Sequence, residues 1–179
     1  ENKNWYIEYA TGSISNRNQL CKINEFAEIA KNNIGKEIYR SMFLYDETIV
    51  DFVSKNQTVV GFNGVQSIDK LVVDVDYIIN DNELGNQTRK KVMDVVDVME
   101  KLTIDPTHYN LWFSGKGFHI HLANVYEFKD SNQIAKQVRA TMQRDFGEHI
   151  DLIYDSRRLI RAGFSLNKKT GLYKIPVSF

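Results

Sequence analysis

The chain is poor in cysteine and proline, and it carries no net charge. Cys21 is the only cysteine in 179 residues, which excludes internal disulfides and zinc sites built from paired cysteines and agrees with a reducing compartment. Acidic and basic residues balance at 23 each, so binding to nucleic acid would have to arise from a local basic patch. We expect neither a disulfide framework nor a structural zinc ion in this segment.

Long apolar runs are also missing. No stretch approaches the ~20 apolar residues of a membrane span, and no charged and then apolar leader precedes the first helical pattern. There are two prolines and no repeat or low-complexity linker, while 42% of the residues are hydrophobic. We therefore expect an intracellular single domain over residues 1–179, with one sizeable core and no membrane partner. Because the chain begins at Glu1 without a methionine, we also expect a fragment of a longer protein.

Hydrophobic spacing predicts a helix and then short strands in the first third of the chain. Apolar residues recur at helical spacing over residues 23–30, and residues 33–35 give a stop signal after them. Residues 37–63 hold short apolar runs between charged or glycine breaks, which predicts a small antiparallel meander of strands. The runs are 38–39, 42–45, 48–53 and 58–62.

The rest of the chain predicts alternating strands and helices. Apolar β-branched or alternating runs predict strands at 71–79, 109–113, 118–122 and 172–177. Apolar residues on one face predict an amphipathic helix over 92–102 that ends before Pro106, and a second over 134–146. Asp130 or Ser131 would cap the second helix, Gly147 would stop it, and residues 168–171 would form a turn. This order predicts an α/β fold of the α+β type, a mostly antiparallel sheet with helices packed on one side.

Two aspartates interrupt the most apolar predicted strand. Asp74 and Asp76 stand two positions apart, so their carboxylates share one face while Val73 and Val75 point to the other. Paired carboxylates suit Mg²⁺ or Mn²⁺, and a bound cation would offset the cost of placing charge in an apolar strand. A strand end where hydrated aspartates reach solvent fits the pair equally well, so the pair alone leaves both interpretations open.

A second cluster lies between two predicted strands. Its residues are Ser114, Gly115, Lys116, Gly117, Phe118, His119, Ile120 and His121. The two glycines allow backbone amides to turn toward an anion, and the serine and lysine add donors, which indicates a triphosphate cradle. Strand alternation places both histidines on one face and their apolar neighbours on the core face. A plain hairpin turn with surface histidines also fits, as does a zinc site on the two histidines, although no third histidine or cysteine is near in sequence.

The C-terminal part of the chain gathers positive charge. From Asp155 onward there are six basic residues and one acidic residue. The basic residues are Arg157, Arg158, Arg161, Lys168, Lys169 and Lys174. Phosphates are the natural partners of such a patch, although a solvated strand and turn would carry the same charges.

In this order, the clusters resemble the motifs of the archaeo-eukaryotic primase superfamily, which includes the small catalytic subunit of archaeal and eukaryotic primases and the primase-polymerases of viruses, plasmids and repair systems. An apolar strand with Asp-x-Asp is matched by Asp74 and Asp76. A Ser-Gly-x-Gly-x-His segment is matched by residues 114–119. The third motif begins with an aspartate, matched by Asp151. It continues with an Arg-Leu-Ile-Arg run, matched by residues 158–161. It ends with a Gly-Ser-Leu-His/Asn-x-Lys turn and Thr-Gly, matched by residues 163–171.

The resemblance implies a template-directed nucleotidyltransferase that makes primers or extends strands from NTPs or dNTPs. It implies a catalytic core of the superfamily's type, a mostly antiparallel sheet with an RRM-like unit flanked by helices. Two Mg²⁺ or Mn²⁺ ions would be bound by Asp74, Asp76 and Asp151, which together with His119 would form the catalytic set. The implied nucleotide-binding residues are Ser114, Gly115, Lys116, Gly117, His119, Arg161, Asn167, Lys169 and Arg40.

The implied partners are a single-stranded DNA template, a primer and a nucleoside triphosphate. A helicase or a primase accessory domain outside this chain would be a further partner. The implied setting is a prokaryotic cytoplasm, a virus or a plasmid, or another intracellular place that holds DNA.

The chain departs from the family pattern in ways that keep alternatives open. Asn167 stands where archaeal primases often have histidine, and the segment from Asp151 to Arg158 is slightly longer than theirs, which leaves Asp155 as a rival third metal ligand. A metal-dependent nuclease or phosphohydrolase would use the same aspartates with His119 and His121. A nucleic-acid-binding or nucleotide-binding module with a degenerate site is the non-catalytic alternative.

Overall fold

A six-stranded antiparallel sheet pairs five strands from the first part of the chain with one strand near residue 160. The computed structural model describes residues 4–75 and 86–178. The strand order is β5-β4-β1-β3-β9, with β2 also paired to β1. The strands are β1 (Tyr6–Thr11), β2 (Gln19–Lys22), β3 (Ile38–Ser41), β4 (Leu44–Tyr45), β5 (Gln66–Ser67) and β9 (Leu159–Arg161). The pairing of β3 with β9 sets Tyr39 opposite Arg161, so distant parts of the sequence meet.

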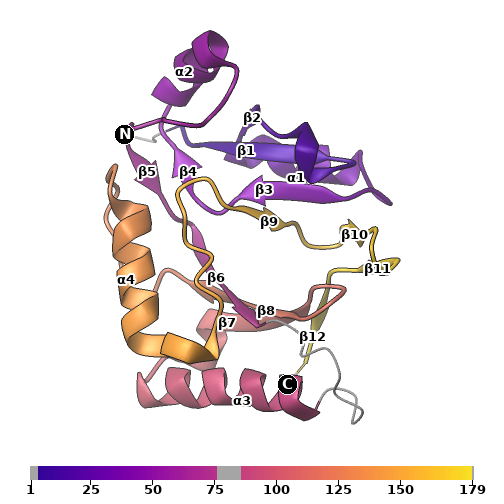
Figure 1. Ribbon diagram of the computed structural model, residues 1–179, viewed down its shortest axis with the longest axis vertical. Coiled ribbons are helices and arrows are strands. Elements are labelled where there is room, and N and C mark those ends of the chain that lie inside the picture. The colour runs from indigo at the N-terminus through magenta and orange to yellow at the C-terminus, as the bar shows by residue number, and fades with distance from the viewer. Residues whose placement is uncertain (1–3, 76–85, 179) are drawn as a thin grey trace.

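A second, four-stranded sheet carries two of the sequence clusters. Its order is β12-β7-β8-β6, and all its pairings are antiparallel. The strands are β6 (Lys70–Val75), β7 (Tyr109–Phe113), β8 (Phe118–Ala123) and β12 (Ile175–Val177). A small hairpin of β10 (Leu166–Asn167) and β11 (Leu172–Tyr173) lies at one end, between the levels of the two sheets (Figure 1). The molecule is therefore layered, and the hairpin lies at one end of the space between the sheets.

Four α-helices accompany the sheets in the described residues. They are α1 (Phe26–Lys31), α2 (Thr48–Asn56), α3 (Asn86–Lys101) and α4 (Ile134–Phe146). The 3₁₀ helices are Ile14–Asn16, Ile23–Glu25, Pro106–His108 and Gly147–His149. In Figure 1, α3 lies beyond the four-stranded sheet on the side away from the six-stranded sheet, and α4 flanks the molecule at one edge. Within the described residues, no helix has the length and apolar character needed to cross a membrane.

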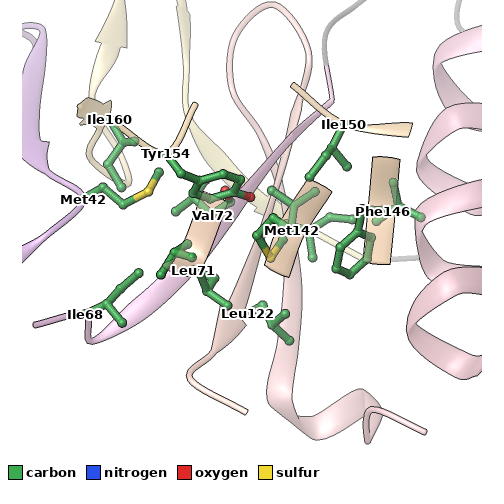
Figure 2. Close-up of a cluster of buried hydrophobic side chains, with 14 of the residues drawn as sticks. Met42, Ile68, Leu71, Val72, Leu122, Met142, Phe146, Ile150, Tyr154 and Ile160 are labelled. Carbon is green, nitrogen blue, oxygen red and sulfur yellow. The ribbon is translucent and has the colours of Figure 1, made fainter. Parts of the chain in front are cut away.

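The largest hydrophobic core joins the four-stranded sheet to α3 and α4. Val95 and Met99 of α3 and Val138 and Met142 of α4 are each fully buried, because each helix turns a stripe of apolar residues spaced three or four positions apart toward the sheet. Figure 2 shows Met142 packed among the apolar side chains of this cluster. Burial of this size holds β6 and β8 rigidly in place, and β6 and β8 carry Asp74 and the histidines.

The predicted fold class is confirmed: the structure is mixed α+β with antiparallel sheets. The helix over 134–146 and the strands at 109–113 and 118–122 form at or within a residue of their expected bounds, and residues 23–31 form a 3₁₀ turn followed by α1. The helix expected over 92–102 is present as α3 but begins earlier, at Asn86. The strand expected over 71–79 forms β6 as far as Val75, and residues 76–79 lie outside the described residues. The prediction of one sheet was incomplete, because β3 and β4 belong to a separate sheet from β6 to β8. Sequence periodicity assigns strands but carries no information about which strands pair.

The predicted meander over 37–63 was wrong in its second half. Residues 48–56 form α2, and residues 58–62 form turns. Asp46 starts the helix, since its Oδ1 accepts the Thr48 N–H at 3.0 Å. Ile49 and Phe52 are three positions apart and both contribute to a cluster around Tyr45, so a short β-branched run also satisfied helical spacing.

Two smaller expectations near the C-terminus also changed. Ser131 Oγ accepts the Gln133 N–H at 3.3 Å just before α4 begins, so the serine orders the approach to the helix and does not cap its first turn. The predicted closing strand over 172–177 is divided at Lys174 into β11 and β12, which belong to different sheets. This division turns the Lys174 side chain into the protein.

The irregular segment 151–158 forms hydrogen bonds to both sheets. The Tyr154 hydroxyl donates to the Val72 carbonyl of β6 at 3.0 Å, and Figure 2 shows the Tyr154 ring beside Val72. On the other side, the Ser156 carbonyl accepts from Tyr45 Oη at 3.1 Å and from Gln66 Nε2 at 3.0 Å. These hydrogen bonds, one buried and two part-buried, fix the path of the chain between Asp151 and β9.

We predict that Tyr154→Phe destabilises the protein by about 1–2 kcal/mol, because the buried Val72 carbonyl loses its hydroxyl partner. Urea denaturation followed by circular dichroism measures the loss. Tyr173→Phe is the matched control: this tyrosine is 42% exposed, so we expect a change within about 0.5 kcal/mol. Equal midpoints for wild type and Tyr154→Phe would contradict the prediction.

Candidate active site

One cleft brings residues of all three sequence clusters together. It has a volume of about 210 Å³ and lies where β6 and β8 of one sheet face β9 of the other. Its lining residues are Tyr39, Asp74, Ser114, Lys116, Gly117, His119, Ile153, Arg158, Leu159, Ile160, Arg161 and Asn167. A larger cavity of about 550 Å³ near the C-terminal ends of α3 and α4 contains none of the predicted site residues. The smaller cleft is therefore the candidate site.

Asp74 lies in the cleft, and Asp151 lies beside it along the backbone. The Asp151 N–H donates to the Asp74 carbonyl at 3.1 Å, in an isolated antiparallel bridge at the edge of β6. Asp155 instead accepts from Arg158 Nε at 3.0 Å. The geometry thus brings Asp151 next to Asp74 and gives Asp155 a cationic partner of its own. Asp76 lies outside the described residues, and its place beside Asp74 stays a prediction.

The carboxylates of Asp74 and Asp151 are the type of ligand that a hard cation prefers. Within residues 4–75 and 86–178, no three histidine, cysteine, aspartate or glutamate side chains come together in a way that would hold a metal ion. The predicted set includes Asp76, which lies outside those ranges. Asp74, with 23% of its side chain exposed, and the exposed Asp151 are adjacent along the backbone, and both carry carboxylate oxygens of the kind that Mg²⁺ and Mn²⁺ prefer.

The turn after β7 is tight, and some of its hydrogen-bonding groups bond to each other. The Ser114 N–H donates to the Gly117 carbonyl at 2.8 Å, and the Gly117 N–H donates to Ser114 Oγ at 3.0 Å. Gly115 has φ +87°, and a Cβ there would lie 2.8 Å from Asn167 Cβ, so only glycine fits between the turn and β10. The turn therefore offers an anion fewer backbone N–H groups than predicted, because the Gly117 N–H is already bonded to Ser114 Oγ.

Both histidines of β8 point between the two sheets, as strand alternation predicted. His119 is paired with Asp74 across the sheet, and His121 with Val72. Each histidine is only 9% exposed, so the interpretation of surface histidines on a plain hairpin is wrong. Their side chains meet a third group, the Lys174 ammonium, which lies 2.8 Å from His119 Nδ1 and 2.8 Å from His121 Nε2.

Electrostatics keep both imidazoles neutral. Burial, followed by the nearby Lys174 cation, holds the pKa of His119 well below its ordinary value, and the same two causes lower the pKa of His121. His119 Nε2 lies 3.5 Å from Asp74 Oδ1, which for a neutral ring is a polar contact longer than a good hydrogen bond. A zinc ion shared by the two histidines does not fit, since the two nitrogens that converge already face an ammonium group.

Arg161 is held at the side of the cleft by β3. Its Nη1 lies 3.3 Å from Glu37 Oε1, and its Nη2 donates to the Tyr39 hydroxyl at 3.0 Å. The guanidinium carbon also lies 4.9 Å from the centre of the Tyr39 ring. Burial is the largest single influence on the pKa of Glu37 and raises it, but hydrogen bonds from Tyr39, Arg161 and the Lys168 N–H together lower the pKa below its ordinary value. Arg161 is thus preoriented, with its charge partly neutralised before any ligand arrives.

Three predicted nucleotide-binding residues are not among those that line the cleft: Gly115, Arg40 and Lys169. Arg40 forms a two-pronged ion pair with Asp69, with both nitrogen–oxygen distances 2.9 Å, and it borders a separate small cavity next to His121. Lys169 has an exposed side chain, and its N–H donates to Asn167 Oδ1 at 3.1 Å. For Arg40 the sequence indicated a cation in an early strand, but no local pattern reveals that Asp69 neutralises it.

Sequence reasoning missed Lys174 as part of the site. The sequence analysis counted it among the cations of the C-terminal basic patch, whose natural partners are phosphates. In the structure Lys174 is 0% exposed, while its neighbours Tyr173 and Ile175 are 42% and 43% exposed. The lone signal in the sequence was a lysine at the centre of an otherwise apolar closing strand.

The cleft has two chemically different sides. Asp74 gives one side a carboxylate, with Asp151 next to it along the backbone, and the Ser114–Gly117 turn, the His119 ring and the Asn167 amide form a side rich in neutral donors. Lys116 and Arg158 add exposed cationic side chains at the rim.

A scan against protein-family models and searches of curated proteins and of solved structures gave no match. What can be said of the cleft's chemistry therefore comes from its own residues.

Because burial, followed by repulsion from Lys70, lowers the pKa of Lys174 from 10.5 to about 7, we predict that stability rises between pH 7 and pH 9. The unfolded chain keeps the lysine proton in this range while the folded chain loses it, so raising the pH favours the folded state. Wild type should gain roughly 2 kcal/mol between these pH values.

Urea denaturation at pH 7, 8 and 9 measures this gain, and Lys174→Met is the comparison. Burial also lowers the pKa of Lys70, but that contribution is common to both proteins. A wild-type profile parallel to that of Lys174→Met would contradict the assignment.

Proposed function

We propose that this chain is the catalytic domain of a DNA primase or primase-polymerase of the archaeo-eukaryotic primase type. It would join nucleotides on a single-stranded DNA template with NTPs or dNTPs as substrates. The observation that carries the proposal is the single cleft, in which Asp74, the turn at residues 114–117 with His119, and Arg161 with Asn167 lie together. These residues come from segments far apart in the sequence, and they match the family motifs in order.

The division of the cleft into two sides suits a nucleoside triphosphate bound with metal. Asp74, Asp76 and Asp151 would hold two Mg²⁺ or Mn²⁺ ions, which would supply activation of a 3′-hydroxyl and charge compensation at the leaving pyrophosphate. The donor side would bind the triphosphate oxygens through the Ser114–Gly117 turn and His119 Nε2.

Each nearby residue then has a defined task. Lys116 is exposed at the rim, where a flexible ammonium group would pair with an outer phosphate. Arg161 is already held by Glu37 and Tyr39, so it would add a fixed positive potential without having to reorganise. Primer and template would contact the exposed cations around the cleft, with phosphates supplying most of the affinity.

We predict that Asp74→Asn and Asp151→Asn each abolish nucleotide incorporation while leaving the fold intact, because each removes a carboxylate ligand. The matched control is Asp155→Asn, which should keep activity within a few-fold of wild type, since Asp155 pairs with Arg158. The assay is incubation with Mn²⁺, all four NTPs or dNTPs and a single-stranded template, with and without a primer.

The products separate the candidate functions. Chains made without a primer identify a primase, and extension that needs a primer identifies a polymerase. Shortening of the template would instead identify a metal-dependent nuclease. Binding of nucleic acid without any product would indicate a non-catalytic module. Full incorporation by Asp74→Asn would refute the proposed metal site.

We also predict that His119→Ala weakens binding of a nucleoside triphosphate by about tenfold or more, as expected for the loss of one good hydrogen bond to a charged group. Titration calorimetry with dATP and ATP, each with Mn²⁺, measures the affinity. His108→Ala is the matched control, because His108 is exposed and borders the larger cavity. Unchanged affinity in His119→Ala would argue against the triphosphate cradle.

A further inference from the structure

The Lys174 ammonium group is enclosed by acceptors. The residue is fully buried, and its Nζ lies 2.8 Å from His119 Nδ1, 2.8 Å from His121 Nε2 and 2.9 Å from the Arg161 carbonyl oxygen. An ammonium group has three N–H donors and no acceptor. Three donors therefore meet three partners at hydrogen-bond distance.

This match fixes where the histidine protons are. The Arg161 carbonyl accepts only, so the other two ammonium hydrogens must go to the two rings, and each ring nitrogen that faces Lys174 must present a lone pair. A neutral imidazole has one N–H. His119 therefore carries its proton on Nε2, and His121 carries its proton on Nδ1.

We propose that Lys174 is a positioning residue that holds His119 as an Nε2–H donor directed into the cleft. The outward nitrogen of His119 is the one 3.5 Å from Asp74 Oδ1, and His119 lines the cleft. A nitrogen that carries a proton cannot bind a metal ion, but it donates well to an anionic oxygen. The arrangement selects a phosphate oxygen as the partner of His119, and this part of the inference rests on the proposed function.

Other charged groups around Lys174 leave the assignment unchanged. Arg40, Lys70 and Arg161 add positive potential, while Asp74 is the carboxylate that favours the lysine's charge. These side chains act on Lys174 through charge, since the three partners of its Nζ are two ring nitrogens and a backbone carbonyl. The cations also disfavour a second proton on either imidazole, so the neutral tautomers are retained.

Trp112 closes the cluster on its far side. Its ring stacks on His121 with centroids 5.0 Å apart, and the Lys174 Nζ lies 5.7 Å from the Trp112 ring centre. Gly163 approaches this ring so closely that a Cβ would lie 2.9 Å from Cζ3. With tryptophan packed in this way, water is a poor competitor for the ammonium hydrogens, and a single hydrogen-bond arrangement is maintained.

The test is ¹⁵N NMR of the histidine side chains in the whole chain at pH 6, where Lys174 is protonated. We expect a protonated Nε2 and an unprotonated Nδ1 for His119, and the reverse for His121. In Lys174→Met, which keeps the length of the side chain but has no donor, we expect the fixed tautomers to be lost. A wild-type His119 that is protonated on Nδ1 overturns the inference, and so do unchanged tautomers in Lys174→Met.

Sodium tripolyphosphate is the binding probe, because it has the linked phosphates of a nucleoside triphosphate but neither a sugar nor a base. We expect it to shift the wild-type His119 Nε2 resonance, and we expect Lys174→Met to bind it about tenfold more weakly. Equal affinity in a variant whose tautomers have changed overturns the link between Lys174 and the ligand.

These measurements test the role of Lys174 separately from the proposed function. The tautomers are measured without any nucleotide, so they test Lys174 even if the protein does not polymerise. If Lys174→Met does not fold, the wild-type spectrum still decides the tautomer of His119. If the tautomers hold but tripolyphosphate does not bind, the proposed function fails and the structural role of Lys174 stands.

Discussion

A single buried ammonium group connects the two sheets at the point where the cleft forms. Lys174 lies between β11 and β12, contacts two histidines of β8 in the four-stranded sheet, and donates to the Arg161 carbonyl of β9 in the six-stranded sheet. Placing a cation in the interior is costly, and only a complete set of partners makes it tolerable. The orientation of the His119 ring and the backbone position of Arg161 both depend on this contact.

Other groups of the cleft are likewise held in place by contacts within the protein, before any ligand binds. Glu37 and Tyr39 orient the Arg161 side chain. Asp151 is brought to Asp74 by a backbone hydrogen bond, so the two residues lie side by side through main-chain geometry. Such preorganisation is what phosphoryl transfer requires, because its transition state is stabilised chiefly by position and charge.

The sequence predicted the parts of this site that obey local periodicity. The alternation of β8 placed His119 and His121 on one face, and the order of the motifs alone associated Asp74 with them. Pairings between distant strands left no local pattern, so neither the second sheet nor the neutralisation of Arg40 by Asp69 was predictable. Lys174 was misassigned for a related reason: its burial depends on partners more than 50 positions away in the chain.

The pairing of β3 with β9 has a consequence for how the protein acquires its site. Tyr39 lies opposite Arg161, and the chain between them must first be folded into both sheets before this ladder can close. Non-local contacts of this kind form late, because loop closure is entropically unfavourable until other contacts compensate for it. During synthesis, β6, β7 and β8 emerge well before residues 159–177, and until then His119 and His121 lack Lys174, and Trp112 lacks Gly163. We therefore expect assembly of the cleft to be a late event in folding, with the histidines reaching their final protonation pattern only after residues 159–177 have packed into place.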